Sequence, residues 1–323
     1  MSGWLFLLII IAGNDLAIRW PTTELNKMSR TETISQQIPE STERLVDERV
    51  LGTVGRPLLR YHGGKWILAP WIIKHFPTHR VYCEPFGGAA SVLLQKRPCY
   101  AEIYNDLDGE IVNLFFIVRQ RGSEMSEALR YTPFSRVEFE LSYQPTDDDF
   151  ERARRTVVRS FMGFGSASSS GRKTGFRSNS NRSGTTPAHD WKNYPDAMQG
   201  IIDRLRGVVI ENRNAIQVME SCDGLDTLHY VDPPYVLDTR YNGQKTKCYN
   251  HEMTDDDHIE LCEFLKQLRG TVVVSGYDHE IYNDILSGWH KHTRKAYADG
   301  AKERTEVLWI NRKENTGQIG LFQ

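Results

Sequence analysis

The stretch "RVYCEPFGGAASVLLQKRPCYAEIYN", residues 80–105, decides the fold class of this chain. An apolar run at 80–85 leads into two glycines and a helix-like segment, and a second apolar run follows at 100–105. Beyond it, apolar residues recur at the i, i+3, i+4, i+7 spacing of one helix face, at Ile111, Leu114, Phe115 and Val118. Strands and helices that alternate with short connections are typical of a parallel sheet in an α/β protein.

The same alternation of strand-like and helix-like segments returns in the second half of the chain. Strand-like runs lie at 207–212, 227–232, 270–277 and 305–312. Thr254 with Asp257 resembles a capping box, which marks the start of a helix. Residues 122–200 instead carry helix-like pieces and a Gly/Ser-rich loop at 163–184. We therefore predict one α/β core, built from 56–121 and 201–323 and interrupted by a mainly helical insertion at 122–200.

The composition is that of a soluble globular protein, with 39% hydrophobic and 25% charged residues among 323. Residues 1–55 are expected to form a poorly ordered extension. Their apolar run at 4–13 is too short to span a bilayer, which needs roughly 20 apolar residues. We expect no membrane association, and Met28 is an alternative start of the chain.

Cysteine usage argues for a reducing cytoplasm. The five cysteines are odd in number and form no CxxC pair. Neither a disulfide framework nor a zinc site is therefore expected, and we predict no metal.

The glycine pair in "EPFGGAAS", residues 84–91, follows directly after a predicted strand. Gly87 and Gly88 allow a tight turn and a close approach of the backbone to a ligand. The GxGxxG fingerprint of dinucleotide-binding proteins is missing, so a plain strand–turn–helix connection is an equal alternative. Asp106 lies roughly 20 residues further on, where an acid can bind a ribose diol. The same aspartate could also cap the following helix, and both roles can hold at once.

A second glycine pair lies upstream in "YHGGK", residues 61–65. Gly63 and Gly64 permit close backbone approach, and Lys65 can neutralise a carboxylate. Taken alone, this stretch is explained more simply by a lysine in a loop before an amphipathic helix.

The stretch "HYVDPPYV", residues 229–236, carries the chemistry. Asp232 lies at the carboxyl end of a predicted strand, where open α/β sheets bind ligands. Pro233 and Pro234 stiffen the backbone and leave carbonyl acceptors, and Tyr235 adds an aromatic face. Two acceptors suit the two N–H bonds of a base amino group and would help localise its lone pair for attack on an electrophilic methyl. Adenine N6 and cytosine N4 both qualify; the simpler alternative is a strand, a turn and a surface tyrosine.

Together, "YHGGK", "EPFGGAAS", "NDLDGEIVNLF" (105–115) and "DPPY" (232–235) occur in an order that resembles the Dam-type, D12-class DNA adenine-N6 methyltransferases, especially those of phages. The order is that of the alpha group of amino-methyltransferases, and the likeness runs from about Arg60 to Arg312. It implies a Rossmann-like sheet that binds S-adenosylmethionine (SAM), with a mainly helical DNA-recognition insertion. It also implies transfer of methyl to adenine N6 in double-stranded DNA after base flipping.

The resemblance also assigns roles to residues. Tyr61 and Lys65 would contact SAM, with Lys65 toward its carboxylate. The turn made by Pro85, Phe86, Gly87 and Gly88 would pass beneath the methionine part, and Asp106 would bind the ribose. Asp232 and the Pro233 carbonyl would take the target amino group, and Tyr235 would stack on the base. Two positions depart from the family pattern: Asn214 replaces an aspartate, and Ala90 replaces a glycine.

Charge distribution suggests where DNA would bind. The net charge of −2 gives no hint of a polyanion partner, but no acidic residue lies between Glu151 and Asp190, where eight are basic. We predict DNA contacts from Arg172, Lys173, Arg177, Arg182 and Arg240. From charge alone, a solvated disordered loop explains the segment equally well.

Three alternatives to adenine methylation remain open from the sequence. They are an amino-methyltransferase for cytosine N4, RNA adenine or a protein amide, a nucleotide-dependent oxidoreductase, and a catalytically silent DNA-binding protein. A cytoplasmic enzyme of a bacterial or phage-infected cell is expected, with a cognate restriction endonuclease as partner if it belongs to a restriction-modification system. The amino-acid sequence of the insertion does not identify the DNA sequence that the protein would recognise.

Overall fold

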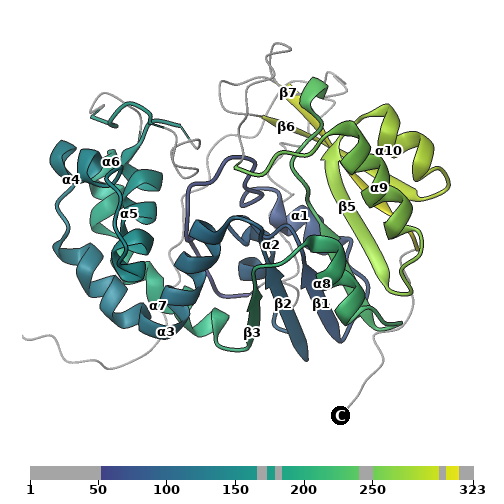
Figure 1. Ribbon diagram of the computed structural model, residues 1–323, viewed down its shortest axis with the longest axis horizontal. Helices are drawn as coiled ribbons and strands as arrows, with labels where there is room; N and C mark the ends of the chain where they lie inside the picture. Colours follow the sequence, from purple (N-terminus) through teal and green to yellow (C-terminus); the bar gives the residue numbers. More distant parts are fainter. Residues whose placement is uncertain (1–51, 166–172, 179–183, 240–249, 298–302, 313–323) are drawn as a thin grey trace, which may run out of the picture. The chain divides into compact units, whose positions relative to one another are not determined.

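The computed structural model describes residues 52–165, 173–178, 184–239, 250–297 and 303–312, so most of the predicted N-terminal extension lies outside it. Its centre is a seven-stranded sheet in the order β3-β2-β1-β4-β5-β7-β6 (Figure 1). The strands are β1 (Val81–Glu84), β2 (Ala101–Asn105), β3 (Val208–Glu211), β4 (Thr227–Val231), β5 (Thr271–Tyr277), β6 (His290–Tyr297) and β7 (Glu303–Ile310).

The sheet is mixed but mostly parallel. Strands β1 to β5 pair in parallel, while β7 pairs antiparallel with both β5 and β6. The α/β class and six of these strands were predicted from apolar runs. Strand β6 was missed because its sequence "HKHTRKAY" contains no apolar run. It is a polar strand at the edge of the sheet, and β7 is its one partner among the described strands.

Helices cover both faces of the sheet, and two separate cores form there. The first core contains buried residues of α1 (Ala69–Lys74), α2 (Ser91–Gln95), α3 (Gly109–Tyr131), α4 (Arg136–Leu141), α5 (Asp149–Met162), α6 (Pro187–Lys192) and α7 (Tyr194–Leu205). The second contains residues of α8 (Ala215–Cys222), α9 (Asp255–Leu265) and α10 (Glu280–Ile285). Strand β4 supplies both cores because successive side chains point to opposite faces: Tyr230 joins the first core and Val231 the second.

The described part of residues 122–200, the predicted insertion, consists mainly of helices, and both limits of the segment fall inside helices. The first, at 121/122, coincides with a kink in α3, where Arg121 leaves helical geometry (φ −128°, ψ 32°). The second, at 200/201, lies within α7. In Figure 1, α4, α5 and α6 stand away from the sheet, while α3 and α7 extend toward β3. The segment is therefore continuous with the core through two long helices.

Helix starts follow local capping chemistry. The predicted capping box opens α9: Thr254 accepts from the Asp257 backbone N–H, and the Asp257 side chain accepts from that of Thr254. Asp108 caps α3 by accepting from the Glu110 N–H. Among the described helices, none combines the length and the apolar character needed to cross a bilayer.

Candidate active site

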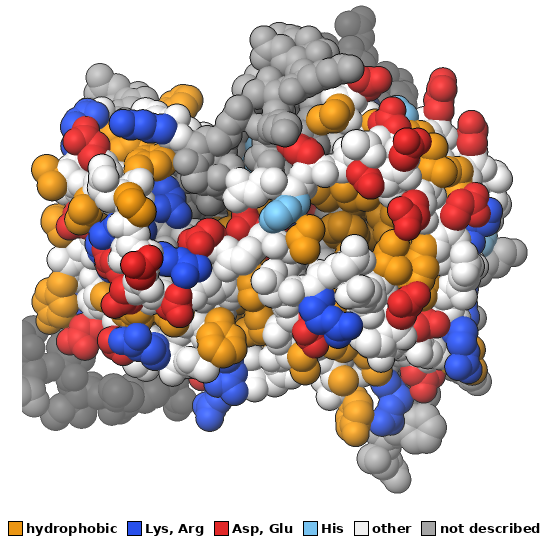
Figure 2. Space-filling model, in the orientation of Figure 1, with side chains coloured by type: hydrophobic (Ala, Val, Ile, Leu, Met, Phe, Trp, Pro, Cys, Tyr) orange, Lys and Arg blue, Asp and Glu red, His pale blue; other side chains and the backbone are white. Residues whose placement is uncertain are grey.

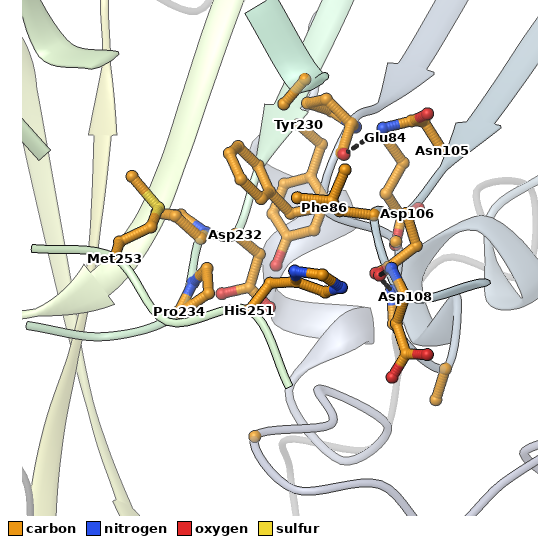
Figure 3. A pocket seen from close by; sticks show the side chains of 18 of the residues that line it. Glu84, Phe86, Asn105, Asp106, Asp108, Tyr230, Asp232, Pro234, His251 and Met253 are labelled. Carbon is orange, nitrogen blue, oxygen red and sulfur yellow. Dashed lines mark hydrogen bonds between the residues drawn. The ribbon is translucent and has the colours of Figure 1, made fainter. Parts of the chain in front are cut away.

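The carboxyl ends of β1, β2 and β4 open onto one cavity of about 310 Å³ (Figure 3). Parallel pairing brings these three strand ends to the same edge of the sheet. The cavity is lined by most of the predicted catalytic and cofactor-binding residues, namely Tyr61, Lys65, Pro85, Phe86, Gly87, Gly88, Asp106, Asp232, Pro233 and Pro234. Segments more than 160 residues apart in sequence thus form one site, whereas Tyr235 does not line the cavity.

Two glycines make the turn after β1 fit against β2. A Cβ on Gly87 would lie 2.1 Å from the Tyr104 ring, and the Gly87 N–H donates to the Asn105 carbonyl at 2.7 Å. Gly88 has a φ of +47°, and a Cβ there would lie 2.9 Å from the Tyr61 ring. The hydroxyl of Tyr104 donates to the Gly88 carbonyl at 2.7 Å. Only glycine leaves the space that this approach requires.

Asp106 holds that turn from the end of β2. Its Oδ2 accepts from the Gly88 N–H and its Oδ1 from the Asp108 N–H, at 2.7 and 2.8 Å. The suggestion that Asp106 caps the next helix is wrong, because Asp108 does so. Burial raises the pKa of Asp106 although both hydrogen bonds oppose the shift.

Ala90 takes the left-handed conformation at the start of α2, with φ 51° and ψ 37°. It is the only non-glycine residue with positive φ among those described. This geometry accounts for the predicted preference for glycine at the position. Asn214, the other departure from the family pattern, lines the cavity and caps α8 through the Ile216 N–H at 2.9 Å.

Asp232 is held by two donors that both engage Oδ1. Lys65 Nζ lies 2.9 Å from it, and the Ser275 hydroxyl donates to it at 2.6 Å. Among the described residues, none donates to Oδ2. Burial by itself lowers the pKa of Lys65, but Asp232 and Glu306 outweigh it, so that pKa is raised. Lys65 is therefore a buried cation, 4% exposed, whose charge is matched by Asp232.

Tyr235 is more enclosed than a surface tyrosine, with 8% of its area exposed. Its hydroxyl donates to Glu306 Oε2 at 3.0 Å. Lys65 Nζ lies 4.5 Å from the ring centre, and Tyr277 packs against the ring in T-shaped geometry at 4.4 Å. A base could reach only the part of the ring that these neighbours leave uncovered.

Glu84 is a buried acid beneath the glycine turn. Its Oε2 accepts from the Tyr82 hydroxyl at 2.7 Å and from the Leu93 N–H at 2.9 Å. Burial raises the pKa of Glu84 to about 8 in spite of these hydrogen bonds. A carboxyl with such a pKa is largely protonated at neutral pH.

Several residues in and around the cavity were not predicted from the sequence. Ser275 contacts Asp232 because the parallel register of β4 with β5 aligns Val231 with Val274, one residue before each. A lone polar residue in the buried strand "TVVVSGY" was the available signal. The sequence around Glu306 on β7 gave no comparable signal. His251 faces the cavity in Figure 3, and its charge lowers the pKa of Asp106 in opposition to burial.

The predicted DNA-binding residues are only partly described, since Arg172, Arg182 and Arg240 lie outside the described residues. Lys173 is exposed. The Arg177 guanidinium donates to the Phe161 carbonyl at 3.0 Å, so this side chain stabilises the local fold.

The basic stretch that starts at Arg152 is less positive than its sequence suggests. Arg152 pairs with Glu110 at 2.9 Å, and Arg154 pairs with Glu138 and Glu151 at 3.0 and 2.6 Å. Figure 2 likewise shows side chains of both signs interspersed over the helices of the insertion. The charge asymmetry read from the sequence is thus partly neutralised by acids that tertiary contacts bring close.

Comparison with known proteins agrees with the motif order. The family model for "D12 class N6 adenine-specific DNA methyltransferase" matches residues 61–307. The DNA adenine methylase of Escherichia coli (strain K12) is 30% identical over 105 residues, which are 30% of this chain and 37% of that enzyme. The DNA adenine methylase of Salmonella typhi is 25% identical over 235 residues, or 69% of this chain and 81% of that enzyme, and a Salmonella typhimurium relative gives the same values.

The family match includes the glycine turn, Asp106 and the DPPY segment around which the cavity is built. The predicted resemblance to Dam-type enzymes is confirmed. The chain belongs to the D12 class of N6 adenine-specific DNA methyltransferases.

Proposed function

We propose that this chain transfers a methyl group from SAM to N6 of adenine in double-stranded DNA, after the base has been flipped out of the helix. The observation that carries the proposal is the environment of Asp232. Lys65 and Ser275 hold its Oδ1 at the edge of a cavity that also contains the glycine turn and Asp106. We regard this sheet as a Rossmann-like methyltransferase core.

The cavity fits the cofactor that the family implies. The absence of a Cβ at Gly87 and Gly88 lets backbone line the cavity closely, while Phe86 and Met253 offer apolar walls (Figure 3). We assign Tyr61, Pro85, Phe86, Gly87, Gly88 and Asp106 to SAM binding. SAM, when bound, supplies an electrophilic methyl group on a positively charged sulfur.

The residues of DPPY would activate the amine by accepting its hydrogens. Oδ2 of Asp232 and the carbonyl oxygen of Pro233 accept the two N6–H bonds, which directs the nitrogen lone pair out of the ring. Pro233 and Pro234 keep that carbonyl in place because the proline rings restrict the backbone. We also assign Oδ2 as the acceptor of the proton that N6 releases after transfer.

Lys65 has a role beyond the one implied by family resemblance. Its ammonium pairs with Oδ1 of Asp232 and would keep this carboxylate oriented, with Oδ2 left for substrate. A contact between Lys65 and a SAM carboxylate stays a prediction. So does stacking of Tyr235 on the base, for which the enclosed ring offers limited area.

We propose that the helical segment 122–200 supplies DNA recognition, with phosphate contacts from Lys173 and from Arg172, Arg182 and Arg240. Support comes from the exposed position of Lys173 and from the basic stretch without acids up to Asp190. Arg177 is a weaker candidate because its guanidinium binds a backbone carbonyl.

Labelled-methyl transfer tests the proposal directly. The purified protein is incubated with SAM and unmethylated bacterial DNA or RNA, and the digested nucleosides are identified. N6-methyladenine in DNA is the expected product. N4-methylcytosine, methylated RNA or the absence of transfer to DNA would refute it. Sequencing of the product gives the recognition site, which in turn tests for a restriction endonuclease of matching specificity.

The substitution Asp232→Ala tests the catalytic assignment. We expect methyl transfer to be abolished while SAM binding, measured by calorimetry, remains detectable. Transfer at a rate near that of the parent would contradict the role given to Asp232.

A further inference from the structure

A second cluster of reactive side chains lies on the other face of the sheet, in the core formed with α8, α9 and α10. Cys83 on β1 and His229 on β4 are direct partners in the parallel register of these strands. Helix α8 ends at Cys222 above them. The two Sγ atoms and a ring nitrogen of His229 all lie within 4.8 Å of one another. Three segments therefore bring two thiols and an imidazole to one point.

The imidazole of His229 is oriented for a ligand. Its Nε2 lies 3.1 Å from Oδ1 of Asp223, and the two carboxylate oxygens of Asp223 are fixed by the N–H groups of Arg269 and Gly270 at 2.8 and 2.9 Å. Because a carboxylate accepts hydrogen bonds, the proton is assigned to Nε2, and Nδ1 then carries a lone pair.

That lone pair is buried and accepts no hydrogen bond from the described residues. His229 is 0% exposed, and its Nδ1 has no hydrogen-bond partner among the residues that the structure describes. Buried polar atoms are nearly always paired, so an unpaired ring nitrogen on a histidine of this cluster points to a missing partner. Metal-ligating histidines usually donate their other ring N–H to a carboxylate or carbonyl, as the imidazole of His229 does to Asp223.

We propose that Cys83, Cys222 and His229 bind a thiophilic d¹⁰ metal ion of the Zn²⁺ type. Two thiolates and an imidazole are the donors that such ions prefer. Binding would draw the donor atoms together by up to about 1 Å, given Zn–S and Zn–N bonds of about 2.3 and 2.0 Å. Each thiol loses its proton as its bond to the metal forms, so two protons are released per ion.

The remaining coordination position would hold water. Cys222 is only half-buried and gives the ion a route from solvent, whereas Cys83 and His229 are closed in. The bound ion would tie α8 to β1 and β4 on the side of the sheet away from the first core. Two neighbours of the cluster line the active-site cavity. They are Glu84, which directly follows Cys83, and Ala215, the first residue of α8. The ion would thus brace the floor of that cavity without contacting substrate.

Metal titration of the reduced, metal-stripped full chain tests the site independently of methyl transfer. We expect one equivalent of Zn²⁺ to bind, with release of protons and a rise in the thermal midpoint. Cd²⁺ should give the ultraviolet charge-transfer band of thiolate coordination. Absence of stoichiometric binding, or binding without a thiolate band, would mean an adventitious ion only and would overturn the proposal. So would a disulfide between Cys83 and Cys222 that persists under reducing conditions.

Matched variants locate the ion. Cys222→Ala and Cys222→Ser remove a half-buried ligand and are expected to abolish the Cd²⁺ band. His229→Gln, which preserves a donor toward Asp223, should weaken binding by at least about tenfold. Cys262→Ala removes a buried thiol of α9 outside the cluster and should bind the ion like the parent. Unchanged Zn²⁺ affinity in folded Cys222 variants would refute the site.

Discussion

At the scale of single residues, the geometry around Asp232 separates its two oxygens. Lys65 and the Ser275 hydroxyl both bind Oδ1, at 2.9 and 2.6 Å, so the carboxylate is fixed by one atom and presents the other. The Ser275 oxygen also lies 3.0 Å from the Tyr230 hydroxyl, and either group can be the donor in that pair. Ser275 therefore fixes the position of Asp232 Oδ1, and we propose that it acts on the reaction through Asp232.

Replacement of Ser275 tests this positioning. We expect Ser275→Ala to lower kcat by about 10- to 100-fold, because a hydrogen bond to a charged group contributes about 1.5–3 kcal/mol. The KM for SAM should change little, since Ser275 does not line the cavity. Steady-state kinetics separates the two parameters. Ser221→Ala, on the exposed end of α8, is the control, and an unchanged kcat for Ser275→Ala would remove its positioning role.

Glu84 makes stability depend on pH in the direction opposite to that of a paired surface acid. Below about pH 4.5, its ordinary pKa, the carboxyl is protonated in both the folded and the unfolded chain. Between there and about pH 8 the unfolded chain loses the proton while burial makes the folded chain keep it. Its contribution to the free energy of unfolding therefore falls by up to about 1.4 kcal/mol per pH unit and levels off above that range.

The variant Glu84→Gln should remove this slope. The amide keeps an oxygen that can accept from Tyr82 and Leu93, and it does not ionise. We expect the variant to gain stability relative to the parent as the pH rises from 5 to 8, as measured by urea unfolding. The exposed change Glu220→Gln should leave the pH profile of the parent unaltered. Parallel profiles for Glu84→Gln and the parent would show that Glu84 is ionised in the folded protein.

At the scale of elements, α3 and α7 pack closely where α3 carries a glycine. A Cβ on Gly122 would lie 2.5 Å from a side-chain carbon of Ile202 on α7. Gly200, also on α7, is exposed, and a Cβ there meets nothing within 4 Å. The two glycines have the same helix propensity but opposite surroundings.

Alanine at these two positions should therefore act in opposite directions. Gly200→Ala is expected to raise the free energy of unfolding by about 0.5–1 kcal/mol, because alanine loses less backbone entropy in a helix. Gly122→Ala should lower it by about 1–3 kcal/mol, since the methyl group forces the helices apart. Chemical denaturation measures both. A stabilising Gly122→Ala would mean that the two helices are not in close contact.

At the scale of the whole molecule, a buried ion cluster joins the last turn of α7, just beyond the predicted insertion, to the sheet. Glu102 on β2 accepts from Arg204 on α7 at 2.5 and 2.8 Å and from Lys96 at 2.5 Å. Burial alone would raise the pKa of Glu102, but Arg204 and Lys96 lower it, so the carboxylate stays ionised. Two buried cations depend on this one acid.

Loss of that acid should destabilise the whole fold. Glu102→Gln leaves Lys96 and Arg204 buried without a counter-charge, and we expect a loss of about 3–5 kcal/mol. Asp196→Asn breaks the exposed pair with Arg130 and should cost less than about 1 kcal/mol. Urea unfolding compares them. Similar small effects for both would show that the cluster does not hold α7 to the sheet.

Local chemistry determined a large part of this protein. Apolar runs marked six of the seven strands, the Thr254–Asp257 pair marked a helix start, and four motifs in order indicated the family. Such features are readable because the residues that define them are neighbours in the chain. Strand β6 was not readable, since a polar edge strand is specified by its partner β7.

Tertiary structure alone decided the partners of those motifs. Asp232 meets Ser275 through the register of β4 with β5 and meets Lys65 from the loop before α1. The basic stretch loses charge to Glu110 and Glu138, which lie outside it in the sequence. Cys83, Cys222 and His229 likewise meet only because β1 and β4 are paired beneath α8. The physical reason is that electrostatic and ligand contacts act over a few ångströms of space, whereas sequence patterns report only on neighbours along the backbone.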